Sequence, residues 1–481
     1  MLDVYAHFSK NDIIIIDMKI YDVVADLCSF IIKSCTEDFF VLYSCISVAE
    51  KQRIFSIVSE MLPEFFETAN YARFSQGFSI HQFSDSEFTP EFYGRLEKLV
   101  LTLKNEKDFF AVVGLVQIID ESLETILKNE IRKFQEDDFS VIMNSNREQV
   151  GVGLLPRCSC CWERKRRLSH YYNRIDNFLF NLLVLENSIL GELIDKHIFL
   201  KPDFFKDFES KKALKIAATP LQLEKNFDFN FHVADKVQYF SIDYKGLFSK
   251  AEEDALWGKI VVAGENGSDI IVFPEALGKK DMVGAIQKKI RENDGKIPIP
   301  SMIVLPSHWE NFQNTVTVLD RHGSIVCRQS KQNPFKEVYN GTNWLEHIRA
   351  NNIINILHFQ GVGRIAILIC KDFLTTKYTE QLMRCFKLTL LIVPSFSTGS
   401  YDFKQSFDLC AHDDCNVVWI NSCAAMEEGK EHNFENIGYV RKRISRKEDE
   451  SQKLFEMKTC SGAFCGKCKK DCIFFETIGA V

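Results

Sequence analysis

The spacing of hydrophobic residues changes partway along the chain. From about residue 20 to residue 200, apolar residues recur every three or four positions, which is the spacing of amphipathic helices. The pattern is clearest over residues 47–69, 108–134 and 173–196. No repeat of fixed period is present, so the sequence predicts an irregular helical domain rather than a solenoid. Its composition does not identify a role.

After Pro202 the pattern changes, and from about Lys236 short apolar runs alternate with helical stretches. Helices are predicted over 248–266 and 376–387, and the tetrad Asp320 to Gly323 predicts a hairpin turn. The sequence therefore predicts an α/β domain with buried, partly antiparallel sheets, and domains over 1–215 and 216–481. The predicted strands are 236–242, 269–275, 301–307, 314–320, 323–329, 364–370, 388–395 and 416–422.

Composition narrows the class of protein. A chain of 481 residues with 46% apolar content favours two globular domains, and a formal net charge of -7 disfavours nonspecific attraction to nucleic acid or to anionic membranes. The N-terminal residues do not resemble a secretory signal, and no segment has the roughly 20 apolar residues that a membrane helix needs. The 16 cysteines are therefore expected to be free thiols, metal ligands or nucleophiles in a reducing cytoplasm.

Three predicted strands end in chemically reactive side chains. Glu275 follows the apolar run Ile270–Phe273 and Pro274, Lys331 follows the strand after the hairpin turn, and Cys370 ends the run Ile365–Ile369. Taken singly, Glu275 reads as a solvated carboxylate and Cys370 as a small core residue. Together, a thiol, a carboxylate and an ammonium provide a nucleophile, a base and a group that stabilises an oxyanion.

These blocks resemble the nitrilase, or carbon-nitrogen hydrolase, superfamily. The resemblance rests on Phe273-Pro274-Glu275, on Gly323 with Lys331 eight residues later, and on Cys370-Lys371-Asp372, in the family's order. It covers roughly residues 236–421 and implies an αββα sandwich that associates into homo-oligomers. It also implies cleavage of a non-peptide amide or nitrile bond through a thioester or thioimidate, with no cofactor required.

The resemblance also implies residue roles. Glu275 would be the general base, Lys331 would stabilise the tetrahedral intermediate, and Cys370 would be the nucleophile. Glu346 is the better candidate for a second, supporting glutamate, and Glu337 is the alternative. Asp372 is expected to orient the turn around Cys370 by accepting backbone N–H bonds. The residues before Lys331 are Gln-Ser where many members have Tyr-Arg, so the nearby pocket is expected to be atypical.

Two further segments carry candidate binding chemistry. Cys460, Cys465, Cys468 and Cys472 have a spacing that fits structural zinc or, with less support, an iron–sulfur cluster, and the alternative is a cysteine-rich tail. A second segment places Cys158, Cys160, Cys161 and His170 beside the basic residues Arg164 to Arg167, with Trp162, Tyr171 and Tyr172 interleaved. Cations and rings together could contact nucleic acid, and an ordinary charged helix start is the alternative.

The leading hypothesis is a cytoplasmic thiol hydrolase that acts on a small amide or nitrile and has no association with a membrane. One alternative is a nitrilase-like protein that binds or senses a metabolite without turnover. The other is a nucleic-acid-associated defence component whose helical N-terminal half provides the partner surface.

Overall fold

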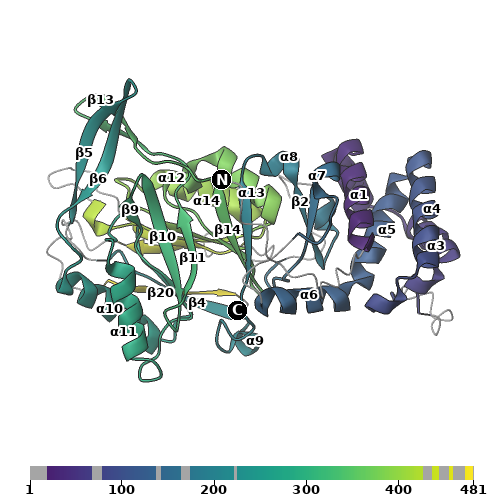
Figure 1. Cartoon of the computed structure of the whole chain (residues 1–481), viewed down its shortest axis with the longest axis horizontal. Coiled ribbons are helices and arrows are strands. Elements are labelled where there is room, and N and C mark those ends of the chain that lie inside the picture. The colour runs from purple at the N-terminus through teal and green to yellow at the C-terminus, as the bar shows by residue number, and fades with distance from the viewer. Residues whose placement is uncertain are drawn as a thin grey trace, which may run out of the picture.

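The N-terminal part of the molecule is built from helices that lie at one end of the structure (Figure 1). The structure is a computed structural model, and it describes residues 19–67, 79–136, 142–163, 174–221, 225–425, 436–443, 454–458 and 472–479. The helices here are α1 (Lys19–Ser34), α2 (Glu37–Ser44), α3 (Val48–Met61), α4 (Pro90–Glu106), α5 (Phe109–Ser122) and α6 (Glu124–Glu136), with the 3-10 turns η1 (Pro63–Phe65) and η3 (Asp85–Glu87). The predicted helical region is confirmed over these residues.

Helix α5 is the central element of this region, because most of its residues are buried. Asp108 caps it by accepting a hydrogen bond from the backbone N–H of Ala111. Near its other end, the carboxylate of Asp120 accepts backbone N–H bonds from residues 180 to 182 at 2.7–3.2 Å. No described helix is both long and apolar enough to cross a membrane.

The prediction of a helix over residues 173–196 is wrong. This stretch contains the turn η4 (Ile175–Asn177), strand β2 (Leu182–Glu186), the short helix α8 (Asn187–Leu190) and the first residues of strand β3 (Ile194–Phe199). Strand β2 pairs with β1 (Val152–Pro156), which follows the short helix α7 (Arg147–Val150). A short run of consecutive apolar residues fits a buried strand as well as a buried helix, so spacing alone could not separate the two.

Two seven-stranded sheets form the centre of the molecule among the described residues. The first has the order β11-β10-β8-β7-β4-β20, with β9 beside β10, and the second has the order β19-β18-β17-β16-β15-β14-β3. The strands of the first are β4 (Ala213–Ala218), β7 (Ile270–Val272), β8 (Met302–Val304), β9 (His308–Glu310), β10 (Gln313–Asp320), β11 (Ile325–Ser330) and β20 (Phe474–Gly479). The second adds β14 (Ile353–Phe359), β15 (Gly363–Ile367), β16 (Leu390–Pro394), β17 (Asn416–Ile420), β18 (Asn436–Arg441) and β19 (Leu454–Lys458).

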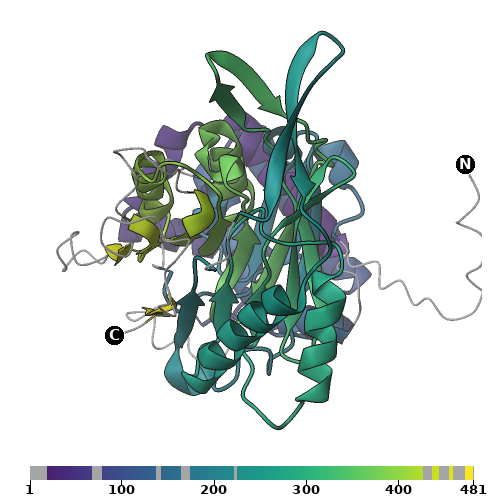
Figure 2. The same cartoon turned by 90° about the vertical axis from the view of Figure 1, so that its left-hand side faces the viewer.

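Alternating residues of the strands join these sheets to each other and to the helices. Ile270 and Val272 of β7 lie in the core shared by both sheets, whereas Ile271 and Phe273 pack against α10 (Lys250–Glu265) and α11 (Met282–Glu292). The helices α12 (Lys371–Leu374), α13 (Thr376–Phe386) and α14 (Tyr401–His412) pack with the second sheet. The predicted αββα sandwich is thus observed (Figures 1 and 2). The remaining short elements are α9 (Phe208–Lys211) and η5 (Cys423–Ala425).

The predicted boundary at residue 215 differs from the observed architecture. Strand β3, from the N-terminal half, pairs in parallel with β14 along its whole length and so belongs to the second sheet. Strand β4 spans residue 215 itself. The sandwich therefore recruits strands from both predicted domains. Strand β3 has the sequence Ile-Asp-Lys-His-Ile-Phe, which does not alternate polar and apolar residues, so no local pattern identified it as a strand.

A small four-stranded sheet projects from the body of the molecule, and we call it the arm (Figures 1 and 2). Its order is β12-β13-β6-β5, and its strands are β5 (Phe227–Ala234), β6 (Val237–Tyr244), β12 (Lys336–Tyr339) and β13 (Thr342–Glu346). It consists of two antiparallel hairpins joined by a short parallel pairing of β13 with β6. Only β6 was predicted from the sequence.

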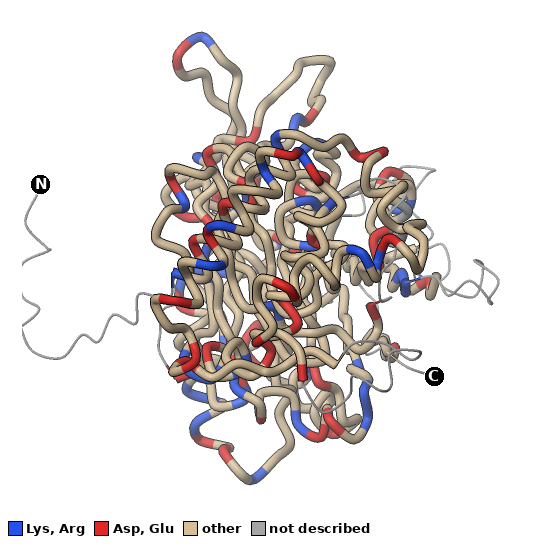
Figure 3. Tube along the Cα trace, turned by 90° about the vertical axis from the view of Figure 1, so that its right-hand side faces the viewer, with Lys and Arg blue, Asp and Glu red and all other residues tan. Residues whose placement is uncertain are grey.

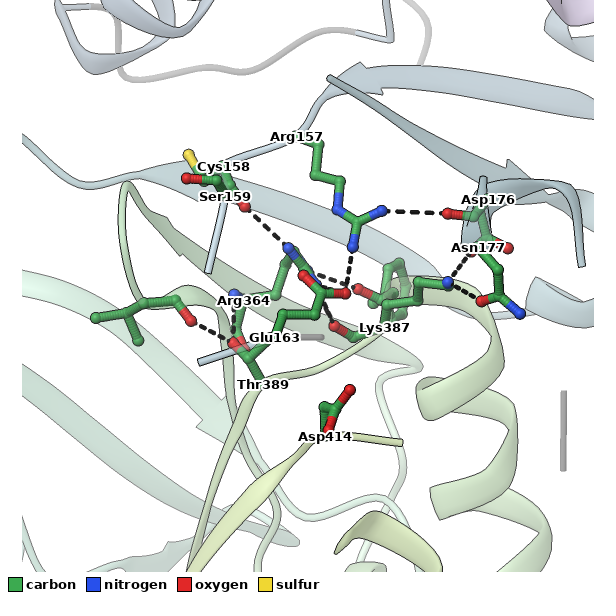
Figure 4. A network of polar contacts seen from close by, with 12 residues as sticks. Arg157, Cys158, Ser159, Glu163, Asp176, Asn177, Arg364, Lys387, Thr389 and Asp414 are labelled. Atoms are coloured by element: carbon green, nitrogen blue, oxygen red, sulfur yellow. Dashed lines mark hydrogen bonds and ion pairs between the residues drawn. The ribbon is translucent and has the colours of Figure 1, made fainter. Parts of the chain in front are cut away.

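A buried charge network fastens the N-terminal part to the second sheet (Figure 4). The guanidinium of Arg364, at the start of β15, is fully buried and donates to the carbonyl of Cys158 at 2.9 Å and to that of Lys387 at 2.7 Å. It also meets the carboxylate of Glu163 at 3.4 Å, which binds Arg157 as well. Because each charge has an opposite charge or a carbonyl beside it, the network holds the two parts together without leaving an uncompensated ion.

Candidate active site

Glu275 lies at the carboxyl end of β7 and its side chain is buried, with 3% of the residue exposed. Pro274 ends the strand, and the backbone N–H of Glu275 donates to the carbonyl of Ser395 at 3.2 Å. The side chain is held at both oxygens. Oε1 accepts a hydrogen bond from Asn314 Nδ2 at 2.7 Å, and Oε2 accepts one from the backbone N–H of Phe396 at 2.9 Å. The carboxylate is therefore fixed in one orientation.

Lys331 follows β11 and places its ammonium between two carboxylates. Its Nζ lies 2.9 Å from Oε1 of Glu275 and 2.7 Å from Oε2 of Glu346. All three side chains are nearly inaccessible, at 3% to 4% exposure. Glu346, the preferred candidate for the supporting glutamate, also accepts a hydrogen bond from the backbone N–H of Phe335 at 3.0 Å. The cluster carries two negative charges and one positive charge away from solvent.

Cys370 completes the cluster from the second sheet. Its backbone N–H donates to the carbonyl of Pro394 at 2.9 Å, so the residue continues the β15–β16 pairing before the chain turns. At the turn its φ is 47°, a left-handed conformation that costs energy in a residue with a Cβ. The charges of Glu275 and Lys331 both act on its thiol. The carboxyl ends of β7 and β15 thus bring Glu275 and Cys370 together across the two sheets.

Burial and the neighbouring charges shift the proton affinities of this cluster. Burial raises the pKa of the Cys370 thiol, the charge of Glu275 raises it further, and the ammonium of Lys331 opposes both. The pKa of Glu275 is raised, chiefly by burial. Burial lowers the pKa of Lys331, but the two carboxylates outweigh it and hold the pKa well above its usual value. The arrangement therefore favours a neutral thiol beside a carboxylate and a permanent ammonium.

Asp372 holds the turn around Cys370, as expected from the sequence. Its carboxylate accepts backbone N–H bonds from Gln332 at 3.0 Å, Asn333 at 2.7 Å and Ile369 at 3.4 Å. Burial raises its pKa to about 6, although these hydrogen bonds oppose the shift. Asp372 thereby ties the segment after Lys331 to the turn that displays Cys370.

Sequence reasoning missed two groups that bind Glu275, namely the side chain of Asn314 and the backbone N–H of Phe396. Asn314 is 1% exposed, and its backbone carbonyl also accepts the N–H of Lys331 at 2.8 Å. An asparagine at the start of a predicted strand reads as a turn residue, so nothing in the local pattern identified it. A backbone donor carries no sequence signal at all.

The other predicted sites are only partly described. Cys460, Cys465 and Cys468, Arg164 to Arg167, and His170, Tyr171 and Tyr172 lie outside the described residues. Cys472 is partly buried, Cys158 and Cys160 are buried, and Cys161 is exposed. Within the described ranges no group of three or more His, Cys, Asp or Glu side chains could hold a metal ion.

Trp162, one of the rings proposed to stack on bases, is buried and donates its indole N–H to the carbonyl of Lys212 at 2.8 Å. Viewed from the helical end, basic and acidic residues are interspersed along the described chain (Figure 3). The buried ring of Trp162 is therefore not available to stack on a base.

Comparison with known proteins gives structural neighbours only. No protein-family model and no curated protein sequence matches this chain. The C. elegans NitFhit protein is similar over 56% of this chain at 14% identity with a TM-score of 0.35, and the chain spans 61% of its length. A Nesterenkonia AN1 amidase from the nitrilase superfamily, in a mutant form, is similar over 51% of this chain and 87% of its own, at 15% identity and a TM-score of 0.35. Another structure of the Nesterenkonia sp. AN1 amidase carries the acetamide moiety of fluoroacetamide on its active site cysteine, with 14% identity, a TM-score of 0.33, and coverage of 51% and 86%.

Proposed function

We propose that this chain is a carbon-nitrogen hydrolase in which Cys370 attacks the carbon of an amide or nitrile. The observation that carries the proposal is the geometry of Glu275. Its buried carboxylate lies 2.9 Å from the Lys331 ammonium, and its Oε2 accepts the backbone N–H of Phe396, two residues after the carbonyl that binds the N–H of Cys370. A base beside a nucleophile and a cation is the arrangement that covalent acyl transfer requires.

In the first half of the reaction, Glu275 takes the thiol proton as the sulfur of Cys370 bonds to the carbonyl carbon. The carbonyl oxygen becomes an oxyanion, and the ammonium of Lys331 stabilises it. Glu275, now protonated, gives its proton to the nitrogen of the tetrahedral intermediate. The carbon–nitrogen bond then breaks, ammonia leaves, and a thioester remains on Cys370.

In the second half, Glu275 takes a proton from a water molecule whose oxygen attacks the thioester carbon. The resulting oxyanion again faces Lys331. When it collapses, the carbon–sulfur bond breaks, the sulfur of Cys370 regains the proton from Glu275, and the carboxylic acid leaves. A nitrile would first give a thioimidate on Cys370. A water molecule would then convert the thioimidate to the thioester with loss of ammonia. In this mechanism Glu346 keeps Lys331 in place through the whole cycle.

The raised pKa values support this order of events. A thiol whose pKa is raised remains protonated at neutral pH, so it needs a base in contact with it to become a nucleophile. A carboxylate whose pKa is raised is a stronger base than an ordinary glutamate. The rate should therefore fall with decreasing pH through the raised pKa of Glu275.

The test is ammonia release from small amides and nitriles, combined with the intact mass of the protein. The expected result is a transient acyl adduct and ammonia release, both abolished in Cys370→Ala. Glu275→Gln keeps the size of the side chain and should lower turnover strongly. The proposal fails if adducts or ammonia release persist in Cys370→Ala. Tight binding of an amide without any turnover would favour the alternative of a metabolite-binding protein.

We also propose, from the resemblance noted in the sequence, that copies of the chain associate through the nitrilase-like domain. The mass in solution, measured by light scattering after size-exclusion chromatography, tests this directly. A single-chain mass across the concentration range would reject it.

A further inference from the structure

One face of the arm carries a continuous set of aromatic side chains that leads away from the catalytic cluster. The register places Phe231 opposite Phe240, and Phe240 opposite Glu346, so all three share one face of the sheet. We call this set the aromatic wall, and it consists of Phe227, Phe229, Phe231, Phe240, Tyr339 and Trp344.

Ring contacts connect the members of the wall. The ring of Phe229 lies 5.6 Å from that of Phe227 and 5.3 Å from that of Phe240. The ring of Phe231 lies 4.8 Å from those of both Tyr339 and Trp344. The two hairpins of the arm therefore share one layer of rings, with centroid distances in the range of favourable aromatic pairs.

The wall meets the catalytic cluster at two points. At one, the ring of Phe227 lies 5.2 Å from that of Phe396, whose backbone N–H holds Oε2 of Glu275. At the other, Trp344 precedes Glu346 by two residues on β13 and so lies on the same face as the carboxylate that binds Lys331. A group bonded to Cys370 that extends past either contact would reach the rings.

Exposure increases along the wall with distance from the cluster. Phe227 and Phe240 are buried, Phe229, Phe231 and Trp344 are half-buried, and Tyr339 is 51% exposed. Rings in the middle of the wall thus keep part of their surface free for contact with another group. Apolar surface placed beside reacting atoms is a common way of binding the unreactive part of a substrate.

We propose that the aromatic wall binds the acyl part of the substrate, and that this part is an uncharged group bearing an aromatic ring. This inference rests on the proposed function, because it assigns the substrate class of the same site. A cationic acyl group is disfavoured, since the ammonium of Lys225 already lies 4.3 Å from the centre of the Phe229 ring. An aromatic ring matches the surface without bringing a second charge.

The first experiment compares three amides on the wild-type protein: propionamide, hydrocinnamamide, and propionamide bearing a terminal trimethylammonium group. The value of kcat/KM for hydrocinnamamide should exceed that for propionamide by on the order of 30-fold. The trimethylammonium amide should show no such gain. Equal values for hydrocinnamamide and propionamide, or a preference for the cationic amide, would overturn the inference.

Variants then locate the effect. Trp344→Ala and Phe231→Ala should each lower the ratio of kcat/KM for hydrocinnamamide to kcat/KM for propionamide by roughly tenfold. Tyr239→Ala is the matched control, because Tyr239 neighbours Phe240 on the same strand but points to the opposite face. Thermal unfolding of each variant establishes that it is folded. A change in oligomeric mass in Trp344→Ala and Phe231→Ala with an unchanged preference would instead assign the wall to packing between copies.

A binding measurement separates this inference from the proposed function. Calorimetry on Cys370→Ala needs no turnover, and hydrocinnamamide should bind on the order of 30-fold more tightly than propionamide. If propionamide acylates Cys370 and hydrocinnamamide has no advantage in rate or binding, only the inference fails. If neither amide acylates Cys370, the proposed function fails, and equal binding of the two amides would then reject the wall as well.

Discussion

Removal of the buried ammonium in Lys331→Met should destabilise the protein in a strongly pH-dependent way. In the wild type, Lys331 Nζ lies 2.9 Å from Glu275 and 2.7 Å from Glu346. Methionine has a similar length and no charge, so it leaves two buried carboxylates without a cation. Removing one partner of a buried ion pair costs about 3–5 kcal/mol, and the exposure of only 3% to 4% leaves little solvent to screen the remaining charges.

The sign of the pH dependence follows from the carboxylates. Burial already raises the pKa of Glu275, and without the ammonium of Lys331, which opposes that shift, the pKa of Glu275 in the folded state should rise further above its unfolded value. A carboxyl whose pKa is raised by folding contributes stability that is present below its unfolded pKa and is lost as the pH rises through the folded pKa. The deficit of Lys331→Met should therefore be smallest near pH 5 and largest near pH 8.

The assay is urea unfolding of both proteins at pH 5 and pH 8. Adding Glu346→Gln to Lys331→Met removes one buried charge and should recover about 1–3 kcal/mol at pH 8. Lys279→Met is the matched control, because Lys279 is a buried lysine 3.0 Å from a single carboxylate, Glu252, outside the cluster of Glu275, Lys331 and Cys370. Its deficit should depend less on pH. The reasoning is refuted if Lys331→Met is as stable as the wild type at pH 8, or if its deficit is the same at both pH values.

Three further changes test other parts of the structure. Burial raises the pKa of Asp372 from 3.8 to about 6, so its contribution to stability should fall by about 2 kcal/mol between pH 4 and pH 7, and a urea titration should find this fall missing in Asp372→Asn. Arg364→Met leaves Glu163 with one fewer cation and should cost about 3–5 kcal/mol, measured by urea unfolding at pH 7, whereas an unchanged midpoint would contradict the structure. In Gly264→Ala the new Cβ would lie 1.9 Å from the carbonyl oxygen of Pro298, so the thermal midpoint should fall by several degrees, and an equal midpoint would show that this contact is absent.

The sequence predicted seven of the fourteen described strands of the sandwich, because these strands carry clear local signals. The runs ending at Glu275 and Cys370 are short, apolar and bounded by a proline or a polar turn, and the hairpin at Asp320 has a turn tetrad with Gly323 at a φ of 78°. Where apolar residues followed one another without a break, as from Leu182 to Leu185, local spacing could not choose between strand and helix. Only pairing with β1 makes that segment a strand, and pairing is a property of the folded chain.

The candidate site likewise contains residues that the sequence predicted and contacts that it could not predict. Glu275, Lys331 and Cys370 were predicted because each follows a recognisable strand, and the structure brings all three into one cluster. The bond from Asn314 to Glu275 joins positions 39 residues apart and depends on how β10 and β7 are arranged within the first sheet. No local pattern encodes such a distance. The Lys331 ammonium between two carboxylates likewise appears only when β13 of the arm returns Glu346 to the cluster.

The position of β3 at the edge of the second sheet determines how the molecule could be shortened. This strand covers one hydrogen-bonding edge of β14, so a fragment beginning at residue 216 would leave the backbone groups of residues 353–358 that face β3 unpaired. Ile354, Ile356 and Phe359 are buried in the intact chain, which makes that edge apolar as well as open. Open apolar edges recruit strands from other molecules. The N-terminal half, through β3, therefore protects the sandwich from aggregation. A shortened chain should keep its solubility only if β3 is retained.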